Sequence, residues 1–73
     1  MDREDVKKLI TEKYSSEIAD DCLGDWMDDH FLEGKIEDYI NKLPELIKKD
    51  LPEEEFWFQA SWLARKCGFV IPD

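Results

Sequence analysis

The stretch SEIADDCLGDWMDDHFLEG, residues 16–34, predicts the fold class of this 73-residue chain. At about 100° of rotation per residue, an α-helix sorts its side chains into an apolar side and an acidic side. The apolar side consists of Ala19, Cys22, Leu23, Trp26, Met27 and His30. The acidic side consists of Glu17, Asp21, Asp25, Asp28 and Asp29. The stretch therefore predicts one amphipathic helix that packs its apolar side on a core and presents a row of carboxylates.

Gly34 and one of two serines set the limits of this helix, and Gly24 lies inside it. Gly24 inside it costs about 1 kcal/mol relative to alanine, so it indicates a bend or a place where a partner comes close. Gly34 fits the left-handed cap that ends many helices. Either Ser15 or Ser16 can begin the helix, because a serine hydroxyl accepts a hydrogen bond from a first-turn backbone N–H group.

Three further helical segments are expected along the chain. The first runs from Asp2 or Arg3 to about Tyr14, and the last runs from Pro52 to the stop signal at Gly68. Residues 35–50 between them keep one apolar phase throughout. The predicted core positions of the three segments are Val6, Leu9, Ile10, Tyr14, Ile36, Tyr39, Ile40, Leu43, Leu46, Ile47, Phe56, Ala60, Leu63, Ala64 and Cys67.

Pro44 leaves two alternatives for residues 35–50. One is a single kinked helix, and the other is two short helices with Pro44 at the first position of the second. We favour the second slightly, because Glu45 then lies in a first turn, where negative charge is favourable. Residues 1–73 are thus expected to form one all-α domain, a compact bundle of four helices, or five if Pro44 divides the third. The apolar tail, residues 69–73, is expected to fold back on the bundle.

The charge of the chain limits its partners. It carries 19 acidic and 10 basic residues, a net charge of −9, so we expect no direct binding to nucleic acid or membranes. No apolar run approaches the roughly 18 residues that span a membrane, and the N-terminal MDREDVKK is unlike a secretory signal. The expected location is the cytoplasm. Cys22 and Cys67 are expected there as reduced, buried side chains, and a disulfide between them requires their helices to touch.

No motif for catalysis stands in the sequence, and we expect no enzymatic activity, metal or cofactor. The only histidine, His30, projects with Trp26 and Met27 and is expected as a packed side chain rather than a general base. Cys22 and His30 are eight residues apart, too far to share a metal directly. A site that adds Cys67 still lacks the usual fourth zinc ligand. Phosphate loops, close cysteine pairs and calcium-binding loops are all absent from the sequence.

Acidic residues concentrate in residues 17–38, which hold nine carboxylates and one basic residue. In a continuous helix, Glu17, Asp21, Asp25 and Asp29 repeat once per turn, about 6 Å apart along the axis. Like charges at this spacing destabilise a helix by a few tenths of a kcal/mol per pair, so a partner is one reason to keep them. Such a row can replace a phosphate backbone in a basic groove. The commoner reason for an acidic face is solubility.

The last helix has a second candidate surface. Phe58 and Trp62 lie nearly opposite its core positions, one turn apart, with Arg65 and Lys66 just beyond. Exposed aromatic side chains beside a cation are typical of interface hot spots. The alternative, which we favour, is that this helix is central and that the apolar tail covers both aromatic side chains. Trp57 lies at the edge of the core side and is expected to be packed.

These observations predict a non-enzymatic protein-binding module whose partner carries a basic surface. Its predicted partner-binding residues are Glu17, Asp21, Asp25, Asp28, Asp29, Phe58 and Trp62. If the partner binds nucleic acid, the module would inhibit it as a DNA mimic that occupies the same groove. Its size and charge suit a phage or mobile-element product. The alternative is a structural module, such as a homodimer, that pairs through the last helix.

Overall fold

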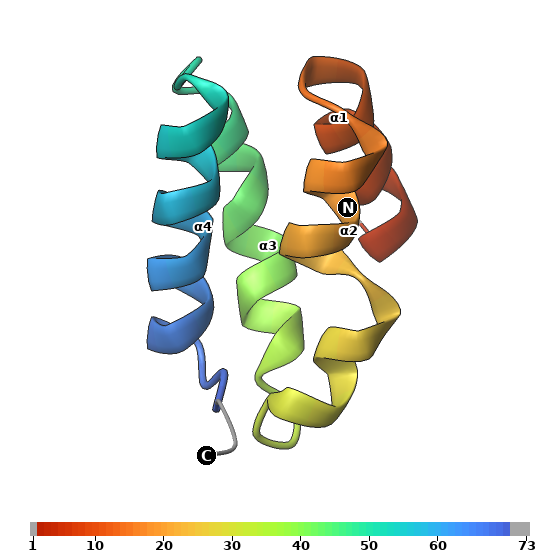
Figure 1. The fold of residues 1–73 in the computed structure, drawn as a ribbon. Helices are drawn as coiled ribbons and strands as arrows, with labels where there is room; N and C mark the ends of the chain where they lie inside the picture. Colours follow the sequence, from red (N-terminus) through yellow and green to blue (C-terminus); the bar gives the residue numbers. More distant parts are fainter. Residues whose placement is uncertain (1, 71–73) are drawn as a thin grey trace.

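The computed structural model describes residues 2–70 and shows an all-α bundle (Figure 1). Within this part of the chain, four α-helices and a short 3-10 helix follow one another: α1 (Arg3–Lys13), α2 (Ser16–Leu23), η1 (Asp25–His30), α3 (Ile36–Ile47) and α4 (Glu53–Lys66). α1 packs against α2 and α3 against α4, and the two pairs meet through contacts of α1 with α3 and of α2 with α4. In Figure 1, α4 lies at one edge of the bundle, beside α3. None of these helices is long and apolar enough to cross a bilayer.

Side-chain caps fix where the first two helices begin. Asp2 accepts a hydrogen bond from the backbone N–H of Asp5 at 3.0 Å, and Ser15 accepts one from Ile18 at 3.2 Å. Each cap satisfies one of the N–H groups that the first turn of a helix leaves unpaired. The predicted start of the first helix, its end near Tyr14 and the serine cap of the second are thereby confirmed.

The prediction of one helix over residues 16–34 is wrong beyond Leu23. At Gly24 the backbone becomes extended, with φ −79° and ψ 160°, and the chain continues as the 3-10 helix η1. The indole of Trp26 folds back over this glycine and donates from Nε1 to the backbone oxygen of Asp20 at 3.0 Å. A Cβ atom at Gly24 would lie 2.4 Å from that oxygen, so glycine permits this close approach. Gly34, with φ 77°, lies in the turn before α3 and does not end a helix.

The favoured division of residues 35–50 into two helices is also wrong. α3 continues through Pro44 as one helix, although a proline removes a hydrogen bond and costs about 3 kcal/mol in a helix interior. The helix persists because it buries side chains on both sides of the proline, including Tyr39 and Ile47. The amine of Lys13 also donates to the carbonyl oxygen of Ile47 at 2.7 Å, which satisfies an acceptor in the last turn of α3.

The core lies where the helices meet, and among the described residues it contains no buried charged side chain. Its members are Val6, Ile10, Ala19, Cys22, Leu23, Met27, Tyr39, Leu43, Leu46, Ile47, Phe56, Ala60, Ala64 and Cys67. The remaining predicted core positions are packed at its margin or half-buried: Leu9, Tyr14, Ile36, Ile40 and Leu63. The core positions predicted for the first, third and last helices are therefore confirmed.

The segment after α4 folds back on the end of η1. Gly68 takes φ 104°, a left-handed conformation that redirects the chain. Two backbone hydrogen bonds of 2.6 and 3.1 Å then join this segment to the end of η1, and between them Phe69 pairs with Phe31 in an isolated antiparallel bridge. The predicted return of the tail to the bundle is thus confirmed for Phe69, while residues 71–73 lie outside the described residues.

Candidate binding face

α4 presents three large aromatic side chains on its outer side. Trp57, Phe58 and Trp62 are 45%, 54% and 51% exposed, and we call these three residues the aromatic face. They point outward because Phe56 and Ala60 occupy the inner side of the same helix. The expectation that α4 is central and covered, with Trp57 packed, is wrong for the described residues. α4 lies at the edge of the bundle, and the described part of the tail packs on η1 instead (Figure 1).

Trp57 lines three hollows that open along α4. The first has a volume of about 380 Å³ and lies between α4, α2 and η1. We call it the Trp26 cavity, because Trp26 forms its η1 side. The second lies on the outer surface of α4, where Trp57, Phe58 and Trp62 all line it. The third lies between the start of α4 and Ile18 of α2. Trp57 is therefore the point at which the three hollows meet.

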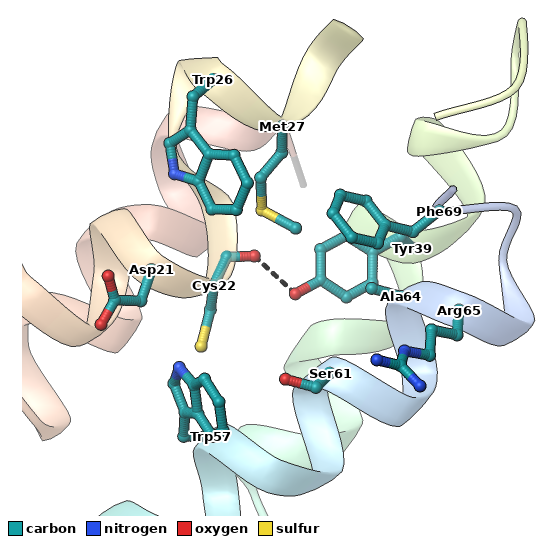
Figure 2. A pocket seen from close by; sticks show the side chains of 10 residues that line it. All are labelled: Asp21, Cys22, Trp26, Met27, Tyr39, Trp57, Ser61, Ala64, Arg65 and Phe69. Carbon is teal, nitrogen blue, oxygen red and sulfur yellow. Dashed lines mark hydrogen bonds between the residues drawn. The ribbon is translucent and has the colours of Figure 1, made fainter. Parts of the chain in front are cut away.

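The Trp26 cavity is lined mainly by apolar side chains (Figure 2). Trp26 and Met27 come from η1, Trp57 and Ala64 come from α4, and Phe69 comes from the segment after α4. The indoles of Trp26 and Trp57 lie on opposite sides of the opening in this view. The polar or charged side chains at its rim are Asp21, Ser61 and Arg65. Residues from distant parts of the sequence thus build one apolar space with a polar rim.

The polar groups inside this cavity already have partners or carry no charge. The Tyr39 hydroxyl donates to the backbone oxygen of Cys22, and the Trp26 indole donates to that of Asp20 (Figure 2 shows the first bond). Burial, together with the nearby charge of Asp21, raises the pKa of the Cys22 thiol to about 12. Burial likewise raises the pKa of Tyr39. Both side chains are therefore neutral near pH 7, and the cavity suits an apolar group.

The residues considered for chemistry are packed or buried in this fold. Among the described residues, no group of three or more His, Cys, Asp and Glu side chains is placed to hold a metal ion. The ring of His30 lies against Trp26 and Phe69, with centroid distances of 5.7 and 5.6 Å, as expected of a packed histidine. Cys22 and Cys67 are free, buried thiols, as predicted.

The predicted acidic row is interrupted in the middle. Its members are all exposed: Glu17, Asp21, Asp25, Asp28 and Asp29. The first two lie on α2 and the other three on η1, which follows a different path after the extended residue Gly24. The expected repeat of one carboxylate per helical turn is therefore wrong beyond Asp21.

α1 supplies basic partners to the acidic segment, residues 17–38, which holds one basic residue of its own, Lys35. Arg3 donates two hydrogen bonds to the carboxylate of Asp28, one of them at 2.9 Å, and the amine of Lys7 lies 3.1 Å from the carboxylate of Asp20. The bond from Arg3 lowers the pKa of Asp28 and raises that of Arg3. The bond to Asp20 raises the pKa of Lys7. Two carboxylates of the acidic segment are thus already paired within the molecule.

Asp21 is the predicted acidic residue that lies beside the aromatic face. It lines both the Trp26 cavity and the hollow that Glu53 and Glu54 line at the start of α4. Arg65 lines the cavity and the hollow on the outer surface of α4. The binding face is therefore apolar in its middle, acidic toward α2 and the start of α4, and basic toward the end of α4.

Sequence reasoning placed some residues of this face and missed others. Asp21 and Phe58 line the same hollow, as a joint site requires, whereas Asp28 lines none of the three. Trp57 was missed, although a helical run of three aromatic residues spans about 200° and must turn one of them outward. A continuous helix places Trp26 in the core, but the break before it leaves this side chain 52% exposed. Glu53 and Glu54 were not among the predicted site residues, although they line the hollow beside Asp21.

No protein-family model, curated protein or solved structure matches this chain. The site is therefore interpreted from its own geometry and chemistry. It consists of a half-exposed aromatic face, an apolar cavity beside it with Asp21 at its rim, and an adjoining hollow that Glu53 and Glu54 line.

Proposed function

We propose that this chain is a non-enzymatic protein-binding module that holds a basic segment of a partner against the aromatic face. One observation carries the proposal. Three large aromatic side chains of one helix are about half exposed, and they border hollows instead of filling them. Clustered aromatic side chains supply much of the binding energy at protein interfaces, because they bury a large area with little loss of side-chain freedom.

The charge of the molecule supports a basic partner. The net charge is −9, and the carboxylates of Asp21, Glu53 and Glu54 border the hollows beside the aromatic face. Opposite charges speed the encounter of two proteins and disfavour wrong partners. Each exposed ion pair adds only about 0.2–1 kcal/mol. We therefore assign the affinity mainly to the aromatic side chains and the selectivity mainly to the carboxylates.

A narrower form of the proposal is the inhibition of a nucleic-acid-binding protein. The exposed carboxylates of Glu17, Asp25 and Asp29 extend the acidic surface beyond the aromatic face, and a module bound in a groove for phosphates would exclude DNA as a mimic. The support for this form is the total negative charge and not a regular spacing of carboxylates, because the row is interrupted after Asp21. A phage origin and a cytoplasmic location are parts of the same proposal, and the free thiols of Cys22 and Cys67 fit a reducing compartment.

The same aromatic face supports a second candidate, a homodimer or scaffold module that pairs through α4. Phe58 and Trp62 are the apolar side chains that such a pairing would bury first. Sedimentation analysis over a range of concentrations distinguishes the two candidates. A mass that doubles with concentration, and that returns to the monomer value in Trp62→Ala, favours the homodimer.

The experiment for the first candidate is affinity capture with an N-terminally tagged bait from a lysate of the source cells. Capture is compared at low salt and at about 0.5 M salt, where the screening length falls to a few ångströms. We expect a basic partner whose capture is reduced at high salt but persists in part, because salt screens the ion pairs and leaves the aromatic contacts in place. The captured protein is then purified, so that its Kd for each bait variant is measured directly.

Three bait variants and a control test which residues bind the partner. Asp21→Lys and Glu54→Lys should each weaken binding by about fivefold, and Trp62→Ala by about thirtyfold. Glu12→Lys is the control, because it makes the same charge reversal at an exposed position of α1 outside the three hollows. If the charge reversals on α2 and α4 act no more strongly than Glu12→Lys, or if no basic partner is captured, the proposal fails.

A further inference from the structure

The interior of the Trp26 cavity favours an apolar occupant. Met27 and Ala64 are buried parts of its lining, while Trp26 and Trp57 supply exposed aromatic surface. The hydroxyl of Tyr39 and the indole N–H of Trp26 already donate to backbone oxygens. A polar group entering this space would leave water without gaining replacement hydrogen bonds, which is unfavourable. A large apolar side chain gains contact with the aromatic rings and loses no such bonds.

The rim of the cavity adds a charge preference to this apolar interior. Asp21 borders both the cavity and the adjoining hollow, where Glu53 and Glu54 supply two more carboxylates. Arg65 borders the cavity as well, from the α4 side. A residue that neighbours the inserted side chain and points toward α2 and the start of α4 therefore meets three carboxylates. A lysine or arginine is the complementary residue at that position.

The walls of the cavity are held in place before any partner arrives. Trp26 is fixed by its bond to the oxygen of Asp20 and by edge contacts with His30 and Phe69, at centroid distances of 5.7 and 6.2 Å. Phe69 is fixed by its bridge to Phe31, and their rings lie 5.3 Å apart. A preformed cavity binds more tightly than a mobile one, because less side-chain freedom is lost on binding.

We infer that the Trp26 cavity receives one large apolar side chain of the partner protein, and that the residue beside this side chain is basic and lies against Asp21, Glu53 and Glu54. This inference rests on the proposed function and specifies its partner. The apolar lining of the cavity and the three carboxylates, Asp21 at its rim and Glu53 and Glu54 in the adjoining hollow, carry it together. Recognition would then depend on a pair of neighbouring residues, one apolar and one cationic, rather than on net positive charge alone.

Small peptide probes test the cavity without knowledge of the partner. Acetylated and amidated Lys–Phe, Ala–Phe, Glu–Phe and Lys–Ala dipeptides are titrated into the isotope-labelled protein. The readout is the NMR signal of each indole N–H group, which reports separately on Trp26, Trp57 and Trp62. We expect Lys–Phe to shift the Trp26 and Trp57 signals saturably, with a smaller shift for Trp62. Its Kd should be about two- to fivefold tighter than that of Ala–Phe, as expected for an exposed ion pair, and Glu–Phe should bind most weakly.

A filling substitution provides the matched test in the protein. Ser61 lines the cavity from α4, and Ser61→Leu places apolar volume there at a helix position that favours leucine over serine. Gln59→Leu is the control, because it adds a similar side chain on the α3 side of α4. We expect Ser61→Leu to abolish the saturable shifts and Gln59→Leu to retain them, with unchanged helix content in both by circular dichroism.

Several outcomes would overturn this inference while the proposed function stands. They are the absence of saturable shifts at Trp26 and Trp57, equal binding of Lys–Ala and Lys–Phe, and undiminished capture of a basic partner by Ser61→Leu. Failure of the proposed function looks different, because the native bait then captures no basic partner at either salt concentration. A concentration-dependent mass that Ser61→Leu alone abolishes would assign the cavity to a second copy of this chain, and would also overturn the inference.

Discussion

Gly24→Ala tests the course of the chain after α2. A continuous helix and the observed break at Gly24 predict changes of opposite sign in the free energy of unfolding. In a continuous helix, alanine in place of glycine stabilises the protein by about 1 kcal/mol. In the structure, the added methyl carbon would lie 2.4 Å from the backbone oxygen of Asp20 and 2.6 Å from the indole of Trp26. Both distances are far below the contact optimum of about 3.5 Å. Either the backbone or the indole must therefore move.

The loss in free energy of unfolding can be worked out from the contacts that this movement breaks. Displacement of the indole breaks the 3.0 Å bond from Trp26 to the oxygen of Asp20, a net loss of about 0.5–1.5 kcal/mol. Overpacking strain adds about 1–3 kcal/mol. The lower entropy of the unfolded alanine chain offsets about 0.4–1 kcal/mol. We therefore expect Gly24→Ala to lower the free energy of unfolding by about 0.5–4 kcal/mol.

Urea unfolding followed by circular dichroism measures this loss. For a protein of this size, a slope of about 1 kcal/mol per molar urea converts the loss into a midpoint that is about 0.5–4 M lower. Gln59→Ala, at an exposed helix position, should stay within about 0.5 kcal/mol of the native protein. In a Trp26→Ala background, the effect of Gly24→Ala should shrink but persist, because the Asp20 oxygen remains in the way. A Gly24→Ala protein as stable as the native one, or more stable, would refute this reasoning.

Three further predictions concern single interactions. Tyr39→Phe leaves the carbonyl of Cys22 without its donor and should lower the free energy of unfolding by about 1–3 kcal/mol in urea, so unchanged stability contradicts a role for this bond. The thiols of Cys22 and Cys67 are buried, and burial with the charge of Asp21 raises the pKa of Cys22 to about 12. A thiol reagent at about pH 8 should therefore label both cysteines only as the protein unfolds. Rapid labelling of the native protein would contradict this burial. The bond from Arg3 lowers the pKa of Asp28 in the folded protein. The pair therefore stabilises the fold fully above the pKa of about 4 that Asp28 has in the unfolded chain. This stabilisation is lost as the pH falls through the lower pKa of Asp28 in the folded protein. Asp28→Asn should therefore reduce stability at neutral pH and have little effect in acid, and an equal reduction at both pH values counts against the pair.

The parts of the fold that followed from the sequence are those fixed by local signals. Acidic residues at the start of α1 and α4, basic residues at their ends and apolar spacing within each helix all act over one or two turns. The course after Leu23 depends on the indole of Trp26 reaching back to Asp20 and on the bridge of Phe31 with Phe69. Helical periodicity carries no information on such contacts, so a continuous helix was the natural prediction there.

The same limit applies to the candidate site. Periodicity placed Phe58 and Trp62 opposite the core of α4, but their exposure depends on where the segment after α4 packs. The sequence predicts a partner-binding role equally for Asp21 and Asp28. In the structure Asp28 is already paired, because Arg3, 25 residues away from it in the sequence, donates hydrogen bonds to its carboxylate. The number of acidic residues could be counted from the sequence. Which of them remain available to a partner depends on the ion pairs that α1 makes with Asp20 of α2 and Asp28 of η1.

The bridge that closes the C-terminal segment onto η1 decides how this protein can be fused or displayed. Phe69 takes part in that bridge and also lines the Trp26 cavity. A domain attached at the C-terminus could therefore displace Phe69 and change the shape of the cavity. Asp2 is exposed and lines no part of that cavity, which makes the N-terminus the better point of attachment. Truncation before Phe69 would remove this wall of the cavity together with the backbone bonds from Phe69 to Ala64 and from Val70 to His30.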